Sequence, residues 1–145
     1  MLSRTTMKKS IHTKRPKLLI VEDDLLISKS IKTYFAKVNY VVKTVRSAED
    51  ARECLKSFTP SAMILDIALP QKNGLEFLKE LRNSESWRHM PVIITTNLDA
   101  EENIHDAYLL SAAAYIVKSD LSLMDLVSKV TNHINISSYA QKTLS

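Results

Sequence analysis

Hydrophobic and polar residues follow two alternating patterns along this chain. Runs of consecutive apolar residues, typical of strands buried on both faces of a sheet, occur at residues 17–21, 40–45, 61–66, 91–96 and 114–117. Each run is followed by a segment with the apolar spacing of an amphipathic helix, at residues 25–38, 47–58, 75–83, 99–111 and 122–134. Strands that alternate with helices form a parallel sheet covered on both faces. The pattern predicts an α/β fold with a doubly wound, five-stranded parallel sheet.

Capping and turn residues mark the boundaries of several elements. Asp24 precedes the first helical segment and is a good N-cap residue, and residues 99–102 have the pattern of a capping box. Thr59 and Pro60 end the second helical segment, because the residue before a proline avoids the helical conformation. Gly74, the only glycine in the chain, lies in a turn, where we expect a positive φ.

The composition is that of one folded domain with a basic N-terminal segment. The 145 residues are 45% hydrophobic and 25% charged, which is ordinary for a globular protein of this size. The formal net charge is +4, but the first 17 residues hold six basic residues and no acid, so the remainder has 14 basic residues against 16 acidic ones. A slightly acidic body argues against nucleic-acid binding by the body itself.

We divide the chain into a disordered basic tail (residues 1–16), a folded domain (residues 17–134) and a C-terminal tail that frays (residues 135–145). The basic tail lacks the apolar core of a secretory signal; an organellar transit peptide and a tail that contacts an anionic partner are the alternatives. No apolar run is long enough to span a membrane, and the single cysteine, Cys54, excludes an intrachain disulfide. We therefore expect a cytoplasmic protein.

Polar residues with related chemistry follow four of the five predicted strands. Because the strands are parallel, their carboxyl ends meet at one edge of the sheet, where ligands bind in open α/β folds. An ionised carboxylate inside a strand would lose its hydration, so the acids belong at this edge. Each residue alone has a simpler explanation as a cap, a strand former or a surface charge. Together they make one candidate site: Glu22, Asp23, Asp66, Thr96 and Lys118.

The candidate site has the chemistry of phosphoryl transfer to a carboxylate. Crowded carboxylates repel each other unless cations offset their charge, and Lys118 together with a hard cation such as Mg²⁺ would do so. One aspartate is then free to attack phosphorus and form an aspartyl-phosphate. The lysine and the metal would neutralise the phosphoryl oxygens, and the threonine hydroxyl would donate a hydrogen bond to them.

These residues make the chain resemble the response-regulator receiver domains of two-component and phosphorelay signalling. The resemblance runs from about residue 17 to residue 134. The matching positions are the acidic pair, the phosphoacceptor, the switch hydroxyl, the switch aromatic and the phosphoryl-binding lysine, namely Glu22 and Asp23, Asp66, Thr96, Tyr115 and Lys118. Residues 69–70 and 73–74 match as well. The signature is specific, because all its positions occur in the family's order.

The resemblance implies a flavodoxin-like (βα)₅ fold with strand order 2-1-3-4-5 and a signalling role rather than that of an enzyme. A histidine kinase or a histidine phosphotransfer protein would supply the phosphoryl group, and the domain would at most catalyse its own phosphorylation and dephosphorylation. Mg²⁺ would be the cofactor, held by the acidic pair, Asp66 and the backbone carbonyl of Ala68. The switched surface would bind a downstream protein that the sequence does not identify, and a phosphorylation-dependent dimer is left open.

Three positions depart from the family pattern. Ser119 replaces the proline that usually follows the lysine, so a cis bond is not expected there. Ser111 lies where the family often has glycine, which predicts a different turn before the last strand. Asn97 replaces a very small residue after the switch hydroxyl, and its larger side chain would narrow access to Asp66.

Other functions fit the residues less well. A phosphorelay intermediate, which passes the phosphoryl group on, is not separable from a signalling endpoint. An aspartate-nucleophile phosphatase needs an acid two residues after the nucleophile, where this chain has Ala68. A docking module with a dead site would not need every ionisable site residue, and a dinucleotide-binding domain would have glycines rather than acids at residues 22–24. We therefore expect a stand-alone receiver domain without a DNA-binding domain.

Overall fold

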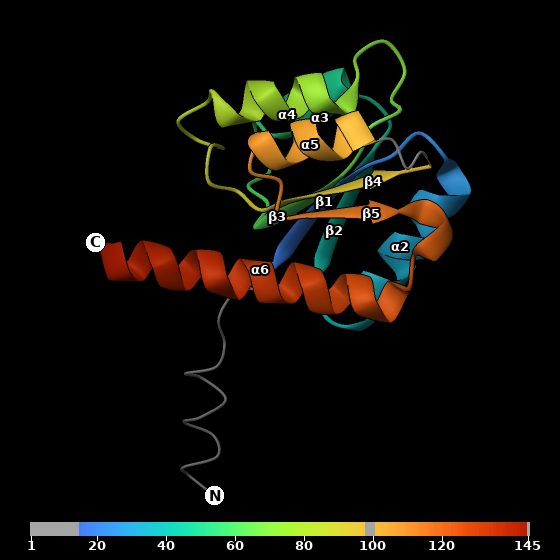
Figure 1. Cartoon of the computed structure of the whole chain (residues 1–145). Helices are drawn as coiled ribbons and strands as arrows, with labels where there is room; N and C mark the ends of the chain where they lie inside the picture. Colours follow the sequence, from blue (N-terminus) through green and yellow to red (C-terminus); the bar gives the residue numbers. More distant parts are fainter. Residues whose placement is uncertain (1–14, 98–100, 145) are drawn as a thin grey trace, which may run out of the picture.

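The computed structural model describes residues 15–97 and 101–144 and shows one parallel sheet of five strands (Figure 1). The strand order is β2-β1-β3-β4-β5, and every neighbouring pair is parallel. The sheet and its order confirm the fold class expected from the sequence. The strands are β1 (Lys17–Val21), β2 (Val41–Val45), β3 (Ala62–Asp66), β4 (Val92–Thr96) and β5 (Ala114–Val117).

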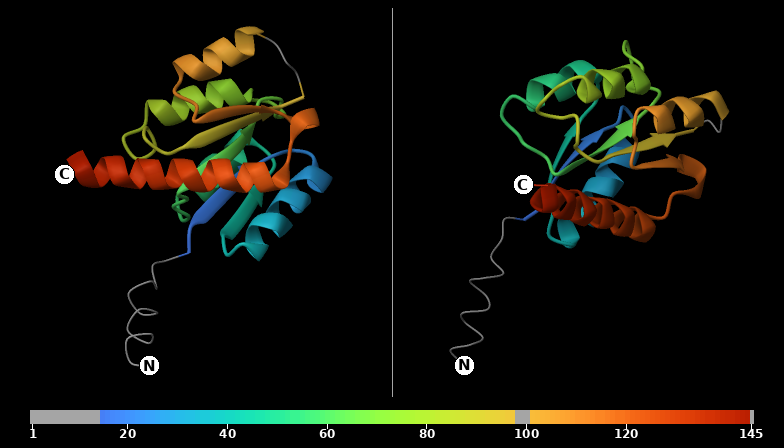
Figure 2. Two further views of the ribbon diagram at one scale, coloured as in Figure 1. Left: turned by 60° about the horizontal axis from the view of Figure 1, so that its bottom comes forward. Right: turned by 60° about the vertical axis from the view of Figure 1, so that its left-hand side comes forward.

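Helices cover both faces of this sheet, as Figures 1 and 2 show. Helices α3 (Ala48–Cys54), α4 (Gly74–Arg82) and α5 (Glu101–Leu109) lie on one face and bury a cluster that includes Phe77 and Leu78. Helices α2 (Leu25–Lys37) and α6 (Leu123–Leu144) lie on the other face and bury Phe35 and Leu126. Doubly covered strands explain the continuous apolar runs, because side chains on both faces meet a helix. No helix in the described part of the chain is long and apolar enough to cross a membrane.

Helix ends differ more from the sequence prediction than strand ends do. Asp24 is the N-cap of α2, with Oδ1 accepting from the amides of Leu26 and Ile27 at 2.9 and 3.2 Å. Helix α3 ends at Cys54 rather than near Phe58, because residues 55–58 continue as short-range turns toward Pro60. The capping box predicted at residues 99–102 falls partly on residues outside the described ranges.

Helix α6 continues to Leu144, so the C-terminal segment that we expected to fray is helical up to that residue. The apolar periodicity weakens after Ile134, but residues 135–144 contain neither glycine nor proline to end the helix. At the other end, most of the predicted basic tail lies outside the described residues. Arg15 donates to the carbonyls of Asn39 and Tyr40, and the Pro16 carbonyl accepts from the amide of Val41.

Gly74 does not have the positive φ that the sequence suggested; Gln71, in the same loop, has φ 69°. Gly74 is instead the first residue of α4, and its amide donates to the Ile67 carbonyl at 2.8 Å. A Cβ atom at Gly74 would collide with the backbone oxygen of Asp66 and lie 2.8 Å from the Cα of Ile67. Glycine is therefore required because two backbone segments approach each other, not because of a left-handed conformation.

Arg82, the last residue of α4, ties three segments together. Its guanidinium donates to the backbone carbonyls of Leu110 and Ser111, after α5, at 2.9 and 3.1 Å. It also donates to three carbonyls in the loop before β4, those of Trp87, Arg88 and Met90, at 3.0 to 3.2 Å. Burial lowers the pKa of Arg82. Ser111 itself has φ 57°, so the turn before β5 adopts, with a serine, the left-handed conformation that usually favours glycine.

Candidate functional site

The carboxyl ends of β1, β3 and β5 bring a lysine between two carboxylates. Glu22 directly follows β1, Asp66 ends β3, and Lys118 directly follows β5. The Nζ atom of Lys118 lies 2.6 Å from Oε1 of Glu22 and 3.0 Å from Oδ2 of Asp66. All three side chains are buried, with at most 7% of each exposed. The sequence therefore identified three residues that the fold brings together, with Lys118 in contact with both carboxylates.

Burial and pairing act against each other at this edge of the sheet. Burial raises the pKa of Glu22, while its bonds from Lys118 and from the amide of Asp24 oppose that effect. Burial alone would lower the pKa of Lys118, but its hydrogen bonds to Glu22 and Asp66 hold the pKa above its ordinary value. Lys118 is therefore a fully charged cation at neutral pH.

The Asp66 carboxylate is oriented by its own loop. Oδ1 accepts from the amide of Ala68 at 3.2 Å, while Oδ2 faces Lys118. The loop is anchored on one side by the Ile67 amide, which donates to the Thr95 carbonyl. On the other side it is anchored by Asn73, whose side chain caps α4 by accepting from the amide of Leu75 at 2.7 Å. Ala68 is exposed, so its surroundings are open to solvent.

Asp23 is also at this edge, but it points toward a different cation. Its Oδ1 lies 3.2 Å from the guanidinium of Arg46, and both side chains are about half exposed. Arg46 comes directly after β2 and before Ser47, the N-cap of α3. The sequence analysis missed Arg46, because an arginine in a loop carries no pattern of its own.

Thr96 and Tyr115 lie on the face of the sheet that α3, α4 and α5 cover. Thr96 is the last residue of β4 and is 1% exposed; its register partner in β5 is Val117. Tyr115 pairs with Ile94, two residues further into the sheet, and packs against the cluster that contains Ala107 of α5. The two switch candidates are therefore offset along the sheet rather than side by side at its edge.

Three further polar residues lie near the ends of β4 and β5. Thr95, which the sequence analysis did not single out, is the register partner of Asp66, and its buried hydroxyl has no hydrogen-bond partner among the residues that the structure describes. Ser119 lies in a 3₁₀ turn (Lys118–Asp120) and follows Lys118 in trans. Asn97 is exposed at the end of β4.

The oxygen atoms at this edge fit a hard cation that retains much of its hydration. Among the described residues, no three His, Cys, Asp or Glu side chains lie close enough to hold a metal by themselves. Mg²⁺ is commonly held by one or two carboxylates with waters and substrate oxygens. Glu22, Asp23, Asp66 and the carbonyl of Ala68 supply oxygen atoms of this kind, and in this structure Lys118 pairs with Glu22 and Asp66 while Arg46 pairs with Asp23. The donor chemistry therefore suits Mg²⁺ and does not suit a fully protein-bound metal.

Comparison with known proteins agrees with this geometry. The family model of the response regulator receiver domain matches residues 18–131. The transcriptional regulatory protein QseB of Escherichia coli O157:H7 is 35% identical over 102 residues, which are 70% of this chain and 46% of QseB. The hybrid signal transduction histidine kinase D of Dictyostelium discoideum is 28% identical over 125 residues, which are 86% of this chain and 8% of the kinase. The chain thus spans less than half the length of either relative.

Solved structures show the same fold. The BeF₃-activated N-terminal receiver domain of Klebsiella pneumoniae RstA is 28% identical, with a TM-score of 0.74 over 81% of this chain and 97% of that domain. Three findings indicate the same family: the strand order, the buried lysine between two carboxylates, and the family match over most of the chain. The chain belongs to the response regulator receiver domain family, whose members are phosphoacceptor signalling domains rather than classical enzymes.

Proposed function

We propose that Asp66 accepts a phosphoryl group from the phosphohistidine of a histidine kinase or a histidine phosphotransfer protein, and that Mg²⁺ supports the transfer. The observation that carries the proposal is the Asp66 carboxylate, buried and oriented by the Lys118 ammonium and the Ala68 amide. The sequence similarity of this chain to a transcriptional regulatory protein and to a hybrid histidine kinase supports a phosphohistidine donor.

The residues present have distinct tasks in this transfer. A carboxylate oxygen of Asp66 attacks phosphorus, the P–N bond breaks, and its electron pair returns to the donor imidazole, which takes up a proton. Lys118 has three N–H donors, of which Glu22 and Asp66 accept two. The third would bond a phosphoryl oxygen. The metal, bound by Asp23, Asp66 and the Ala68 carbonyl, would neutralise charge on the phosphoryl oxygens.

The signalling step would involve the face that α3, α4 and α5 cover. A phosphoryl group on Asp66 supplies oxygens that accept a hydrogen bond from the hydroxyl of Thr96, at the end of the neighbouring strand. Movement of Thr96 would let the Tyr115 ring shift within its cluster and carry α5 with it. A ligand shifts such an equilibrium only by its differential affinity for the two states, and bonds to Thr96 and Lys118 that form only after phosphorylation provide that difference.

Phosphorylation of the full chain by a small phosphodonor tests the acceptor assignment. We expect intact-mass spectrometry to show one added phosphoryl group with acetyl phosphate and Mg²⁺. The adduct should be absent in Asp66→Asn and strongly reduced with EDTA. Asp120→Asn, which changes an exposed carboxylate two residues after Lys118, is the matched control and should label like the wild type. Labelling of Asp66→Asn to the wild-type extent would show that another residue is the acceptor.

A further inference from the structure

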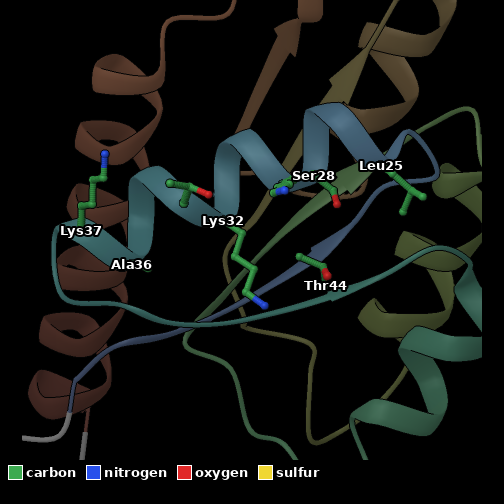
Figure 3. A pocket seen from close by; sticks show the side chains of 8 residues that line it. Leu25, Ser28, Lys32, Ala36, Lys37 and Thr44 are labelled. Carbon is green, nitrogen blue, oxygen red and sulfur yellow. The ribbon is translucent and has the colours of Figure 1, made fainter.

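A groove runs along the outer flank of α2 beside the edge of the sheet (Figure 3). It has a volume of about 770 Å³ and is lined by one stripe of α2 and by Thr44 of β2. The stripe includes the exposed apolar residues Leu25 and Ala36. The groove is separate from the phosphoacceptor site, since Glu22, Asp66 and Lys118 do not line it.

The charged groups that line this groove all have the same sign. They are Lys29, Lys32 and Lys37 of α2, and no acidic side chain is among the lining residues of the described chain. The side chain of Lys32 extends from α2 toward Thr44, whereas that of Lys37 points away from the strand (Figure 3). A positive groove on a slightly acidic body favours an occupant with negative charge.

The strand beside the groove has an open backbone edge. β2 is the last strand of the sheet and, within residues 15–97 and 101–144, pairs with β1 alone. The Val41 amide donates to Pro16 and the Val45 carbonyl accepts from Glu22, so these alternate residues direct their backbone groups toward β1. In a parallel ladder the intervening residues direct theirs the other way. The N–H and C=O groups of Val42 and Thr44 therefore point to the open side, where an added strand would bond them.

We propose that this edge binds an acidic, extended segment of a partner protein by β-strand addition. The segment would pair with Val42 and Thr44 and place carboxylates at alternate positions against Lys29 and Lys32. Thirteen residues of α2 span roughly 20 Å at 1.5 Å per residue, which matches about six residues of an extended peptide.

The same lysines argue against other occupants. A second copy of this chain would bring Lys32 and Lys43 of one edge against those of the other, and lysines on an edge strand oppose such pairing. Nucleic acid is disfavoured because the apolar surface of Leu25 and Ala36 has no complement in a phosphate backbone. The binding mode does not depend on phosphorylation of Asp66, so it can be tested separately from the proposed receiver function.

The probe is a capped heptapeptide of alternating glutamate and valine, titrated into the ¹⁵N-labelled full chain. We expect amide chemical-shift changes concentrated at Val42, Thr44 and residues 25–37. Lys29→Glu combined with Lys32→Glu should weaken binding about tenfold, because two attractive charge pairs become repulsive. Lys79→Glu combined with Lys129→Glu makes the same charge change on the exposed surfaces of α4 and α6 and should bind like the wild type.

Two further peptides make the result decisive. A version N-methylated at alternate residues keeps the charge but loses backbone donors, and it should bind at least about tenfold more weakly. An alternating lysine and valine peptide should not bind. Equal affinity for the N-methylated peptide would overturn strand addition. Equal binding of the lysine peptide or of a single-stranded oligonucleotide, or no shifts at β2, would overturn the assignment of an acidic peptide site. Both double variants should retain wild-type amide spectra, since all four lysines are exposed.

Discussion

Two adjacent threonines at the end of β4, Thr95 and Thr96, face opposite sides of the sheet and therefore have different surroundings. Successive strand side chains point to opposite faces, and Ile93 and Ile94 belong to the clusters on the α2/α6 face and the α3/α4/α5 face, respectively. Thr95 therefore faces the α2/α6 side and Thr96 the other. The family signature identified Thr96. No sequence signal separated Thr95 from an ordinary strand former, because the cost of its unpaired hydroxyl exists only in the folded structure.

Thr95→Val should raise the free energy of unfolding by about 1 kcal/mol. The substitution keeps the shape of the side chain and removes a buried hydroxyl that has no hydrogen-bond partner in the structure. Urea denaturation followed by circular dichroism would measure the change, with an unchanged dependence on denaturant as evidence that the folded state is the same. A lower unfolding midpoint for Thr95→Val would mean that the hydroxyl has a stabilising partner.

At the scale of elements, the sequence predicted strands better than helix ends. The strands are continuous apolar runs whose limits are set by burial, and the predicted range of β5 coincides with the observed Ala114–Val117. The end of α6 was not predictable from periodicity, because the backbone continues as a helix where the apolar pattern weakens. The role of Gly74 was also hidden, since the close approach of α4 to the Asp66 loop is a tertiary contact. Arg82 is a third case: an arginine at a helix end gave no hint of its five carbonyl partners.

Arg82→Lys should lower the free energy of unfolding by about 2 kcal/mol and loosen the end of α5. A lysine ammonium cannot donate to the carbonyls of both segments as the planar guanidinium does. The carbonyls left without a donor in partly buried positions would destabilise the folded state. Hydrogen exchange should accelerate at Ser111 and Ala112, whose amides bond back to α5. Arg88→Lys, at an exposed pair with Glu85, is the control and should change stability by less than about 0.5 kcal/mol. Equal effects of both substitutions would contradict the role of Arg82.

Across the whole molecule, the candidate phosphoacceptor site and the lysine-lined groove lie at different places around the sheet. The edge that carries Asp66 lies at the carboxyl ends of the strands, where ligands bind in doubly wound sheets. From there, Thr96 and Tyr115 lead into the face covered by α3, α4 and α5, while the lysine-lined groove lies beside α2 at the β2 edge. Thr96 and Tyr115 were suggested by the sequence because they match a family motif, and their role as a switch stays a prediction. Sequence reasoning missed the groove, since lysines spaced along a helix resemble any solvated surface.

The Thr96→Val variant should still accept the phosphoryl group. The resulting conformational change in β5 and α5 should be weaker, because the isosteric side chain lacks the hydroxyl that would bond the phosphoryl oxygens. With beryllofluoride and Mg²⁺, we expect wild-type amide shifts to change in β5 and in residues 104–109 of α5, and to change by less than half as much in Thr96→Val. Thr95→Val is the matched control and should respond like the wild type. An undiminished response in Thr96→Val would exclude the Thr96 hydroxyl from the coupling.

The contact between Gly74 and the Asp66 loop has a consequence for how this gene can vary. Every missense change of a glycine codon introduces a Cβ atom, and a Cβ at this position would collide with the backbone oxygen of Asp66. No single substitution can therefore be absorbed there without displacing the backbone of Asp66. Random mutagenesis of this domain should find substitutions tolerated at most loop positions but not at Gly74, although Gly74 has no charge, no hydroxyl and no part in the chemistry.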